Sequence, residues 1–439
     1  MSKKLLEKIE NNTAQICVIG LGQVGLPVAL SFCKAKFVVM GLDINENHIN
    51  LLKNLKSPFK EPVLQELLVE HITGGKFFPT QDNNVILNSD IIIVSVPTPI
   101  SEKIKPDLSF IKNACETISK FELNSKLVII ESSIPPKTFE QLILPTLSKN
   151  QNNNFLASYI PERLSPGQAF EEIHTTSRVV GALDEESRMV SKVLYSKILK
   201  SKIFETNPIV AETCKLVENT FRDVNVAFAN EIAMVCEIYG IDVLELRNIC
   251  NSHPRVNILS PGPGVGGPCL PKDPYLLLNP QNSPQIKSDM ISNARKINDS
   301  MPSHVLEMIE NSLKTNNKKM KNTTITVLGV TYKANVSDTR YSPAEEIIAG
   351  LLKNGCRVIV NDPKTQEVFN GEKEVDVWKS VVKSDMILVL TEHEEFKNLD
   401  LNKIKNLMNK NPILIDTRRM FKKEISEKLG FEYISIGYR

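Results

Sequence analysis

A run of glycines and prolines that ends in a cysteine, PGPGVGGPC at residues 261–269, is the strongest candidate for covalent chemistry. Four glycines and three prolines favour a fixed chain path whose backbone lines a cavity, with Cys269 at its edge. A cysteine thiolate in that place can add to a carbonyl carbon. The alternative is a surface turn that carries an incidental thiol. We predict that Cys269 is a nucleophile.

A polar stripe on an otherwise apolar helix is the second candidate. The helix expected over residues 207–239 starts with Asn-Pro, a typical cap and first-turn proline, and has no glycine. Lys215, Asn219 and Arg222 are spaced to share one face of it. Such stripes are often only solvated, but the apolar residues around this one leave little of the helix for solvent. We therefore expect these side chains to line a cleft.

The run GLGQVG, which starts at Gly20, is a GxGxxG turn between an expected strand and an expected helix, and predicts dinucleotide binding. Gly20 allows the tight turn, Gly22 lets a pyrophosphate approach the backbone, and Gly25 permits close packing of helix on strand. Asp43 ends the next expected strand and would accept from ribose hydroxyls. No arginine stands beside it, which favours NAD over NADP. His48, one helical turn on, either approaches the adenosine or is a surface residue.

Cations gather after strands expected in the last third of the chain. Tyr332 and Lys333 follow one strand, Arg340 lies shortly after them, and Arg418 ends another strand. Three cations at one sheet edge suggest a diphosphate, because Lys and Arg recognise phosphate well, although each alone is an ordinary surface charge.

Three further motifs lie nearer the N-terminus. VPTP and ESSIP end strands at a carboxyl edge, where ligands bind, and PERLSPG supplies an acid and a base at a domain junction.

The elements that must position these residues alternate between strand and helix in two parts of the chain. Strands are expected at residues 14–20, 37–43, 90–99 and 126–136, and again at 324–330, 356–363, 386–390 and 412–419. Many of these runs are rich in β-branched residues, as strands buried on both faces tend to be, and their alternation with helices argues for doubly wound parallel sheets.

The fold class predicted is therefore α/β, with two Rossmann-like doubly wound domains joined by a long central helix and a helical middle domain. We place the NAD-binding domain at residues 1–205, the central helical domain at 206–312 and a second Rossmann-like domain at 323–439. The polar tract KTNNKKMKN at 314–322 is the expected linker, and a helix is expected at 342–355.

Composition excludes several classes of protein. The 439 residues carry a net charge of +2, which gives no reason to expect a nucleic-acid or membrane-surface partner. There is no stretch of about 18 apolar residues and no signal-peptide pattern, so no membrane span is expected. The eight cysteines form no CxxC pair; we expect reduced thiols, a cytoplasmic protein, no metal site, and seven cysteines that are simply small buried hydrophobes.

Taken together, these motifs resemble the nucleotide-sugar 6-dehydrogenases, the family of UDP-glucose and UDP-N-acetylmannosamine dehydrogenases. The matching stretches are GLGQVGLP, VPTP, ESSIPP, PERLSPG, AETCKLVENTFRDVNVAFANE, HPRVNILSPGPGVGGPCLPKDP, GVTYKANVSDTRYSPA and LIDTRR, in family order from residue 20 to 419. The lysine helix and the cysteine loop together are specific to this family.

The resemblance implies that the C6 alcohol of a UDP-sugar becomes a carboxylate while two NAD⁺ are reduced. Cys269 would hold the intermediate aldehyde and then a thioester, Lys215 and Asn219 would assist at the oxygen, and Asp273 and Glu162 would position water. The resemblance implies contacts to NAD from Val24, Asp43, Thr98, Ser133 and Arg340, to the nucleotide-sugar from Lys333 and Arg418 with Tyr332 beside them, and to the sugar from Arg163, Leu164, Arg222, His253, Arg255 and Gly266.

The resemblance leaves open which UDP-sugar is the substrate, because the motifs match two branches of the family. HPRV followed by PGPGVGG resembles the N-acetylhexosamine branch, whereas the Lys-Asp of PCLPKD resembles the glucose enzymes. The expected substrate is UDP-N-acetyl-D-mannosamine, for surface polysaccharide synthesis, with UDP-glucose and UDP-N-acetylglucosamine as alternatives. A two-electron 3-hydroxyacid dehydrogenase and a non-catalytic nucleotide sensor are the other classes. The resemblance and the long helix also imply a homodimer or higher homo-oligomer.

Overall fold

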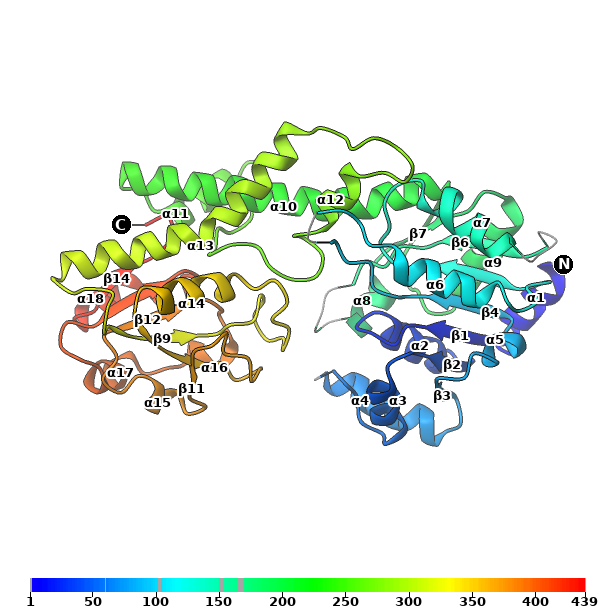
Figure 1. Ribbon diagram of the computed structural model, residues 1–439, viewed down its shortest axis with the longest axis horizontal. Helices are drawn as coiled ribbons and strands as arrows, with labels where there is room; N and C mark the ends of the chain where they lie inside the picture. Colours follow the sequence, from blue (N-terminus) through cyan, green and yellow to red (C-terminus); the bar gives the residue numbers. More distant parts are fainter. Residues whose placement is uncertain are drawn as a thin grey trace. The chain divides into compact units, whose positions relative to one another are not determined.

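The computed structural model describes residues 2–59, 61–101, 104–149, 154–164, 167 and 169–438. The chain folds as two compact units (Figure 1). The N-terminal unit comprises Met1–Glu218 and Lys272–Lys287, and the C-terminal unit comprises Asn219–Pro271 and Ser288–Arg439. The division falls within one long helix, α10 (Pro208–Tyr239).

The N-terminal unit is built on an eight-stranded sheet in the order β3-β2-β1-β4-β5-β6-β7-β8. Its strands are β1 (Gln15–Ile19), β2 (Val38–Leu42), β3 (Phe77–Thr80), β4 (Ile91–Val94), β5 (Leu127–Ile130), β6 (Leu156–Tyr159), β7 (Arg178–Gly181) and β8 (Ile203–Thr206). Neighbours pair in parallel except β6 and β7, which are antiparallel. The predicted parallel sheet is thus interrupted at one pair, because β7 and β8 form a short parallel addition that enters in the opposite direction.

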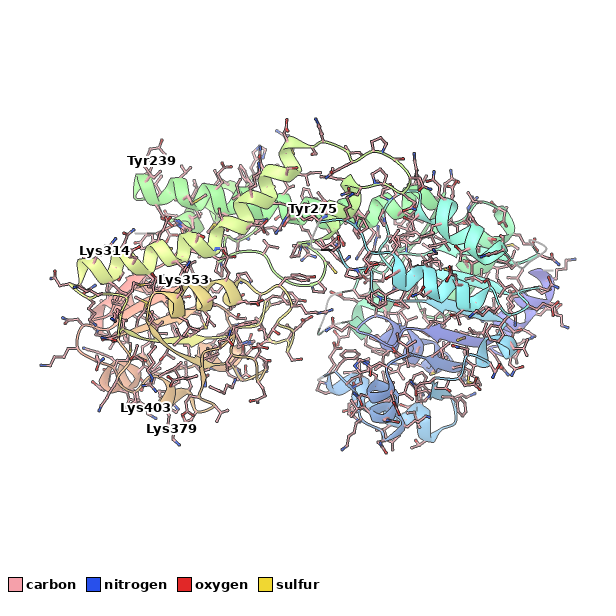
Figure 2. The ribbon with its side chains drawn as sticks, in the orientation of Figure 1. Tyr239, Tyr275, Lys314, Lys353, Lys379 and Lys403 are labelled. Atoms are coloured by element: carbon pink, nitrogen blue, oxygen red, sulfur yellow. The ribbon has the colours of Figure 1, made fainter. Side chains whose placement is uncertain are left out.

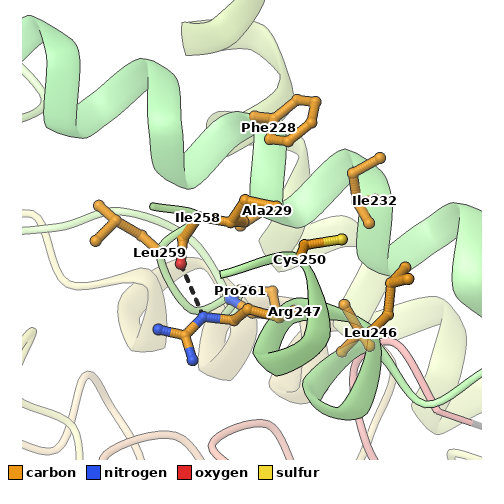
Figure 3. Close-up of a pocket in the computed structure, with 10 residues that line it drawn as sticks. Phe228, Ala229, Ile232, Leu246, Arg247, Cys250, Ile258, Leu259 and Pro261 are labelled. Carbon is orange, nitrogen blue, oxygen red and sulfur yellow. Dashed lines mark hydrogen bonds between the residues drawn. The ribbon is translucent and has the colours of Figure 1, made fainter. Parts of the chain in front are cut away.

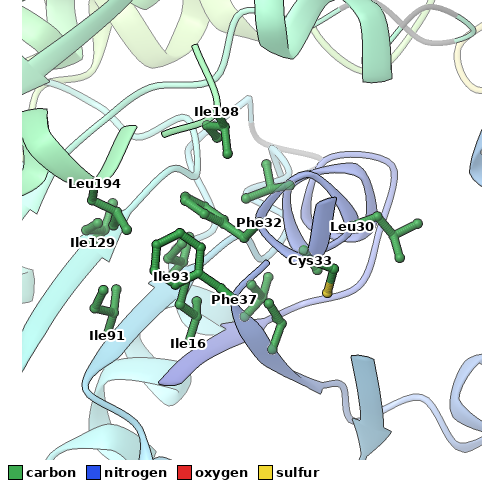
Figure 4. Close-up of a cluster of buried hydrophobic side chains, with 14 of the residues drawn as sticks. Ile16, Leu30, Phe32, Cys33, Phe37, Ile91, Ile93, Ile129, Leu194 and Ile198 are labelled. Carbon is green, nitrogen blue, oxygen red and sulfur yellow. The ribbon is translucent and has the colours of Figure 1, made fainter. Parts of the chain in front are cut away.

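Apolar clusters lie on both faces of this sheet. Successive residues of β1 alternate between them: Ile16 and Val18 join one cluster, whereas Cys17 and Ile19 join the other. Figure 4 shows the first cluster, where Phe32 and Phe37 pack edge to face. The helical elements of the unit are α1 (Ser2–Glu10), α2 (Gly25–Lys34), α3 (Glu46–Lys53), α4 (Pro62–Thr73), α5 (Val85–Asn88), α6 (Ser109–Ile118), the π-helix η1 (Phe139–Ile143), α7 (Leu144–Ser148), α8 (Ala169–Thr175), α9 (Glu185–Ser196) and α12 (Asp273–Leu278).

The C-terminal unit holds a six-stranded, all-parallel sheet in the order β11-β10-β9-β12-β13-β14. Its strands are β9 (Thr324–Leu328), β10 (Arg357–Asn361), β11 (Glu372–Lys373), β12 (Met386–Val389), β13 (Ile413–Asp416) and β14 (Glu432–Ile434). Its other helices are α11 (Val243–Cys250), α13 (Asp289–Thr315), α14 (Pro343–Lys353), α15 (Val377–Ser380), α16 (Glu394–Lys397), α17 (Leu401–Leu407) and α18 (Lys423–Lys428). Lys403 of α17, labelled in Figure 2, lies over the Trp378 ring, with its Nζ 3.8 Å from the ring centroid.

The predicted fold class is confirmed: two Rossmann-like parallel sheets with a helical centre. The middle helices include α13, a 27-residue helix capped by Ser288, whose hydroxyl accepts from the Ile291 N–H. This helix runs to Thr315, so the expected linker at 314–322 begins inside it. The predicted domain boundaries at 205 and 312 fall within β8 and α13, and the three-part division stays a prediction.

Several local expectations need correction. Asp43 and Arg418 lie one and two residues beyond their strands, since β2 ends at Leu42 and β13 at Asp416. Not all cysteines other than Cys269 are buried: Cys214 and Cys250 are partly exposed, and Cys214 packs against the edge of a core cluster. Within the part of the chain that the structure describes, no helix is both long enough and apolar enough to cross a bilayer.

Candidate functional site

The glycine turn between β1 and α2 has the packing that its three glycines predict. Gly20 has φ +91°, and a Cβ there would lie 2.5 Å from the Ser95 carbonyl oxygen. A Cβ on Gly25 would lie 1.8 Å from the Gly20 carbonyl oxygen, so neither position admits a side chain. At Gly22 a Cβ would meet nothing within 4 Å. The middle glycine therefore faces open space at the start of α2, where a pyrophosphate can approach.

Asp43 fixes the same turn from the end of β2. Its Oδ2 accepts from the Leu21 N–H at 2.7 Å, and its Oδ1 accepts from the Asn45 N–H at 2.8 Å. The carboxylate is only partly buried, so each oxygen keeps a lone pair for a further donor. His48, on α3, is half-buried and packs edge to face against Phe59. Asp43 thus ties the glycine turn to the chain after β2 and keeps acceptor capacity for a further donor.

Thr98 and Ser133, from the VPTP and ESSIPP motifs, lie side by side at the carboxyl edge of the sheet. The Thr98 hydroxyl donates to the Ser133 carbonyl at 2.5 Å. The preceding Glu131 is fully buried and accepts from the Tyr195 hydroxyl at 2.7 Å, so it belongs to the interior and not to the edge. Val24 is the N-cap residue of α2 and packs partly against the core.

Lys215 and Glu162 form a buried ion pair. Lys215 Nζ lies 3.3 Å from Glu162 Oε1, and the side chains are 6% and 9% exposed. Glu162 Oε2 accepts from the Leu164 N–H at 2.7 Å. Burial raises the pKa of Glu162, but the charge of Lys215, the Leu164 N–H and the charge of Arg178 outweigh burial and leave it below the ordinary value. Glu162 is therefore a carboxylate at neutral pH, with the lysine ammonium beside it.

Two other predicted residues of the N-terminal unit already have protein partners. Asp273 starts α12, is fully buried, and lies 2.7 Å from the Lys272 ammonium. Arg163 donates to the Ser177 carbonyl at 3.0 Å and forms an ion pair with Glu218. Of the PERLSPG motif, Ser165 and Pro166 lie outside the described residues.

The Cys269 loop packs against the segment that follows β9. A Cβ on Gly267 would lie 2.7 Å from the Tyr332 ring, and one on Gly266 would lie 2.8 Å from the Tyr332 Cβ. The Gly267 N–H donates to the Arg340 carbonyl at 2.9 Å. Burial, and then the charges of Asp338 and Cys269, raise the pKa of Tyr332, and Cys269 itself is partly buried. The two glycines thus allow the loop to pass directly over an aromatic ring.

A buried polar network that the sequence analysis missed anchors the base of this loop. The Gly262 N–H donates to Asn230 Oδ1 at 2.9 Å, and Asn230 Nδ2 donates to Asn298 Oδ1 at 3.0 Å. Asn298 Nδ2 then donates to Asp223, which pairs with Arg295 at 2.5 Å. Polar residues at buried positions of α10 and α13 were the available signal, but their partners lie about 70 residues away.

The remaining predicted sugar contacts differ in burial. Asn219 is 6% exposed on α10, whereas Arg222, three residues on, is exposed. His253 and Arg255 are both exposed in the turn after α11, where the Arg255 N–H donates to His253 Nδ1 at 3.4 Å.

The predicted phosphate-binding cations lie at the carboxyl edge of the C-terminal sheet. Arg418 Nε donates to the Leu390 carbonyl at 2.9 Å, and its backbone N–H donates to Asp416 at 3.1 Å. Arg340 is paired with Asp338 through its Nε and Nη2 atoms, which raises the pKa of Arg340. Lys333 is exposed in the turn after β9.

An apolar pocket lies elsewhere in the C-terminal unit, between α10, α11 and residues 258–261 (Figure 3). Phe228 and Ile232 contribute from α10 and Cys250 from α11. Its one charged side chain among the lining residues, Arg247, donates to the Ile258 carbonyl at 2.9 Å. The lining offers little polar chemistry, so this pocket is not where we place the reaction.

Comparison with known proteins covers almost the whole chain. Models of the UDP-glucose/GDP-mannose dehydrogenase family match residues 14–199 (NAD binding domain), 209–300 (central domain) and 326–423 (UDP binding domain). A UDP-N-acetyl-D-mannosamine dehydrogenase from Methanocaldococcus jannaschii is 38% identical, over 98% of this chain and 99% of its own. An NDP-N-acetyl-D-galactosaminuronic acid dehydrogenase from Ralstonia nicotianae is 31% identical, over 92% and 96%.

Solved structures agree with this assignment. The structure of a UDP-D-ManNAc dehydrogenase from Pyrococcus horikoshii, 36% identical, matches with a TM-score of 0.89 over 96% of this chain and 99% of that one. A UDP-glucose dehydrogenase from Pyrobaculum islandicum, 23% identical with a TM-score of 0.85, shares the fold. The chain therefore belongs to the UDP-glucose/GDP-mannose dehydrogenase family, the NAD-dependent nucleotide-sugar dehydrogenases.

Proposed function

We propose that this enzyme oxidises the C6 alcohol of a UDP-N-acetylhexosamine, preferably UDP-N-acetyl-D-mannosamine, to the uronate in a four-electron reaction that consumes two NAD⁺. The observation that carries the substrate class is the 38% identity, over nearly both full lengths, to a relative of that name. The buried Lys215–Glu162 pair and the Cys269 loop support the chemistry. The product would serve as a precursor for a surface polysaccharide.

The residues around the glycine turn fit NAD. Gly20, Gly22 and Gly25 leave room for the pyrophosphate at the start of α2, and Asp43 would accept from the adenosine ribose. Val24, His48, Thr98, Ser133 and Arg340 are proposed to complete the cofactor contacts. NAD⁺, when bound, supplies the hydride acceptor for both oxidations.

The chain's own groups would carry the covalent steps. The Cys269 thiolate adds to the C6 aldehyde and gives a thiohemiacetal, which on losing a hydride becomes a thioester; water then releases the carboxylate and restores the thiol. Lys215, with Asn219 one turn on, would stabilise the oxygen that bears negative charge. Glu162, which is ionised because Lys215 and the Leu164 N–H stabilise its charge, would orient the water. Asp273 is the second candidate for that role.

Substrate contacts divide between sugar and nucleotide. Lys333, Arg418 and Tyr332 would hold the UDP moiety at the carboxyl edge of the C-terminal sheet, because guanidinium and ammonium groups bind diphosphate oxygens well. The residues proposed for the sugar are Arg163, Leu164, Lys215, Asn219, Arg222, His253, Arg255 and Gly266.

Counting NADH released per sugar tests the reaction. With NAD⁺ in excess and UDP-N-acetylmannosamine limiting, the proposal requires two NADH per sugar consumed and a uronate product by mass spectrometry. One NADH per sugar would indicate a two-electron dehydrogenase, and none would indicate a nucleotide-binding protein without this activity. The product mass separates the first two outcomes independently of the spectrophotometric count.

The preference among sugars has its own test. A site that hydrogen-bonds an acetamido group leaves polar groups unpaired when that group is missing, at about 1–3 kcal/mol each, or roughly ten- to hundred-fold in kcat/KM. The kcat/KM for UDP-N-acetylmannosamine should therefore exceed that for UDP-glucose, and His253→Ala should narrow this gap by slowing the N-acetylated sugar. A wild-type preference for UDP-glucose would refute the choice of sugar and leave the reaction type standing.

We propose further that the enzyme is a homodimer through α10. Phe221, Phe228 and Val235 recur every seven residues and are each more than a third exposed, as is Ile238; Figure 2 shows the equally exposed Tyr239 at the end of the helix. An apolar row of this kind is typical of a helix that packs against a partner.

Light scattering tests the dimer. It should give a dimer for wild type and a monomer for Phe228→Glu, while the control Phe78→Glu, on β3, should stay dimeric.

A further inference from the structure

The segment that follows β12, residues 390–393, lies between the two turns that carry the proposed nucleotide-binding cations. In the sheet, β12 is flanked by β9, which leads to Lys333, and by β13, which leads to Arg418. The strand order also reverses between β9 and β12, the position at which open parallel sheets bind their ligands. This segment is therefore placed to position both turns.

The contact to Arg418 is direct. Arg418 Nε donates to the Leu390 carbonyl at 2.9 Å and lies 3.3 Å from Glu392 Oε2. The segment thus orients the guanidinium from one side.

The contact to the Lys333 turn runs through His393, whose side chain is fully buried. The Asn335 backbone N–H donates to His393 Nδ1 at 3.0 Å. Since a backbone N–H can only donate, Nδ1 carries no proton, and in the neutral ring Nε2 carries the hydrogen. Nε2 lies 3.1 Å from both Asp362 Oδ2 and Thr331 Oγ1. One imidazole therefore links the start and the end of the turn at residues 331–335.

Further hydrogen bonds hold the turn: one within it, one from Thr391 of the segment and one from Glu394, the first residue of α16. The Thr331 hydroxyl donates to the Lys333 carbonyl at 2.9 Å, and the Thr391 hydroxyl donates to the Thr331 carbonyl at 2.5 Å. The Glu394 N–H donates to Asn335 Oδ1 at 3.0 Å. Asn335 has φ +63°, a conformation that costs free energy unless such contacts hold it.

We propose that His393 is a positioning residue for nucleotide binding: by accepting from Asn335 and bridging to Thr331, it holds the turn that presents Lys333 to the diphosphate. The inference rests on the proposed function, because it takes Lys333 and Arg418 as the groups that bind the nucleotide. His393 itself touches only protein, so its effect reaches the ligand through the turn.

Two substitutions separate positioning from mere packing. In His393→Asn the amide oxygen can occupy the place of Nδ1 and accept from Asn335. In His393→Gln the longer side chain reaches the place of Nε2 and leaves the Asn335 N–H without its acceptor. We expect the Gln variant to weaken UDP binding roughly tenfold, the effect of losing one partly buried hydrogen bond that holds the turn, and the Asn variant to recover most of the affinity. The control His304→Gln removes another His–carboxylate pair of this unit and should leave UDP affinity unchanged.

The measurements are calorimetric titration with UDP, without NAD, and steady-state kinetics. The proposal requires a raised KM for the nucleotide-sugar with kcat nearly unchanged in His393→Gln. Thr331→Val, which leaves His393 in place but removes the hydroxyl that holds the Lys333 carbonyl, should raise the Kd for UDP by a smaller factor. Equal losses in the Asn and Gln variants, or a fall in kcat alone, would overturn the inference. If wild type itself fails to bind UDP, the proposed function fails first and this inference with it.

Discussion

Glu131→Gln tests whether the buried Glu131 carboxyl, close to Ser133, stabilises the fold in its protonated form. Glu131 follows β5, is fully buried, and accepts from the Tyr195 hydroxyl. Burial raises the pKa of Glu131 to about 7, and Arg178 and Tyr195 only partly offset that rise. The ordinary value is 4.5, so the folded chain binds this proton more tightly than the unfolded chain does.

The sign and size of the effect follow from those two values. Protonated Glu131 makes its full contribution to the free energy of unfolding below pH 4.5, the pKa in the unfolded chain. That contribution is lost as the pH rises through the folded pKa of about 7. Each tenfold change in proton affinity is worth about 1.4 kcal/mol, so the total loss is about 3 kcal/mol. Glutamine has the shape of the protonated acid and cannot ionise. From pH 5 to pH 8, the free energy of unfolding of the variant should therefore rise by about 2–3 kcal/mol relative to that of wild type.

Hydrogen exchange of the β5 and α9 amides, at pH 5 to 8 and corrected for intrinsic rates, reports this difference where it arises. Fluorescence of the single tryptophan, Trp378, reports on the C-terminal unit instead. A stability difference that does not vary with pH, or a variant less stable than wild type at pH 8, would refute the reasoning.

Glu212→Gln is the matched control, because the pKa of Glu212 is also raised, by burial, to about 7. Its two carboxylate oxygens accept from the Lys137 and Phe139 N–H groups. An amide can satisfy only one of those donors, so this variant should be less stable than wild type by about 1–3 kcal/mol at pH 5, and that deficit should shrink toward pH 8 as the wild-type carboxyl ionises.

Three further predictions concern the reaction. Cys269→Ser should keep NAD and UDP binding while lowering kcat by orders of magnitude, since a hydroxyl is a far weaker nucleophile than a thiolate; wild-type turnover would exclude the covalent role. Asp43→Ala should raise the KM for NAD and relax the rejection of NADP, and an unchanged cofactor preference would contradict the ribose assignment. Gly25→Ala should abolish NAD binding, because its Cβ would lie 1.8 Å from the Gly20 carbonyl oxygen; calorimetry with NAD that shows wild-type affinity would disprove this.

The parts of the site that the sequence predicted are those in which spacing along the chain settles the geometry. The GxGxxG turn fits within one strand–helix connection, so the packing roles of Gly20 and Gly25 follow from their spacing alone. Lys215 and Asn219 are one helical turn apart and both are buried, as the apolar surroundings suggested. The strands of the two sheets could also be predicted from local sequence, because strands buried on both faces consist of short apolar runs.

The parts that sequence could not supply depend on residues far apart in the chain. Glu162 reaches Lys215 across 53 residues, and nothing in either motif indicates the pairing. Asn230 and Asn298 hold the base of the cysteine loop from two different helices. In the sequence, a buried Asn on a helix cannot be told from an exposed one. Only the folded structure shows that the partner of Asn230 is a loop backbone N–H.

The acid that follows β2 and the acid that follows β10 have different roles in the two sheets. Asp43 follows β2 and accepts from the Leu21 N–H, and Asp362 follows β10 and accepts from the Val330 N–H at 2.7 Å. Asp43 is partly exposed and can receive a ribose hydroxyl. The side chain of Asp362 is fully buried and bonded to His393, which leaves it no access to a ligand. The first sheet therefore has an acid that can meet the ribose of a dinucleotide, whereas the second uses the equivalent acid to hold its own turn, which leaves that acid unavailable to a nucleotide.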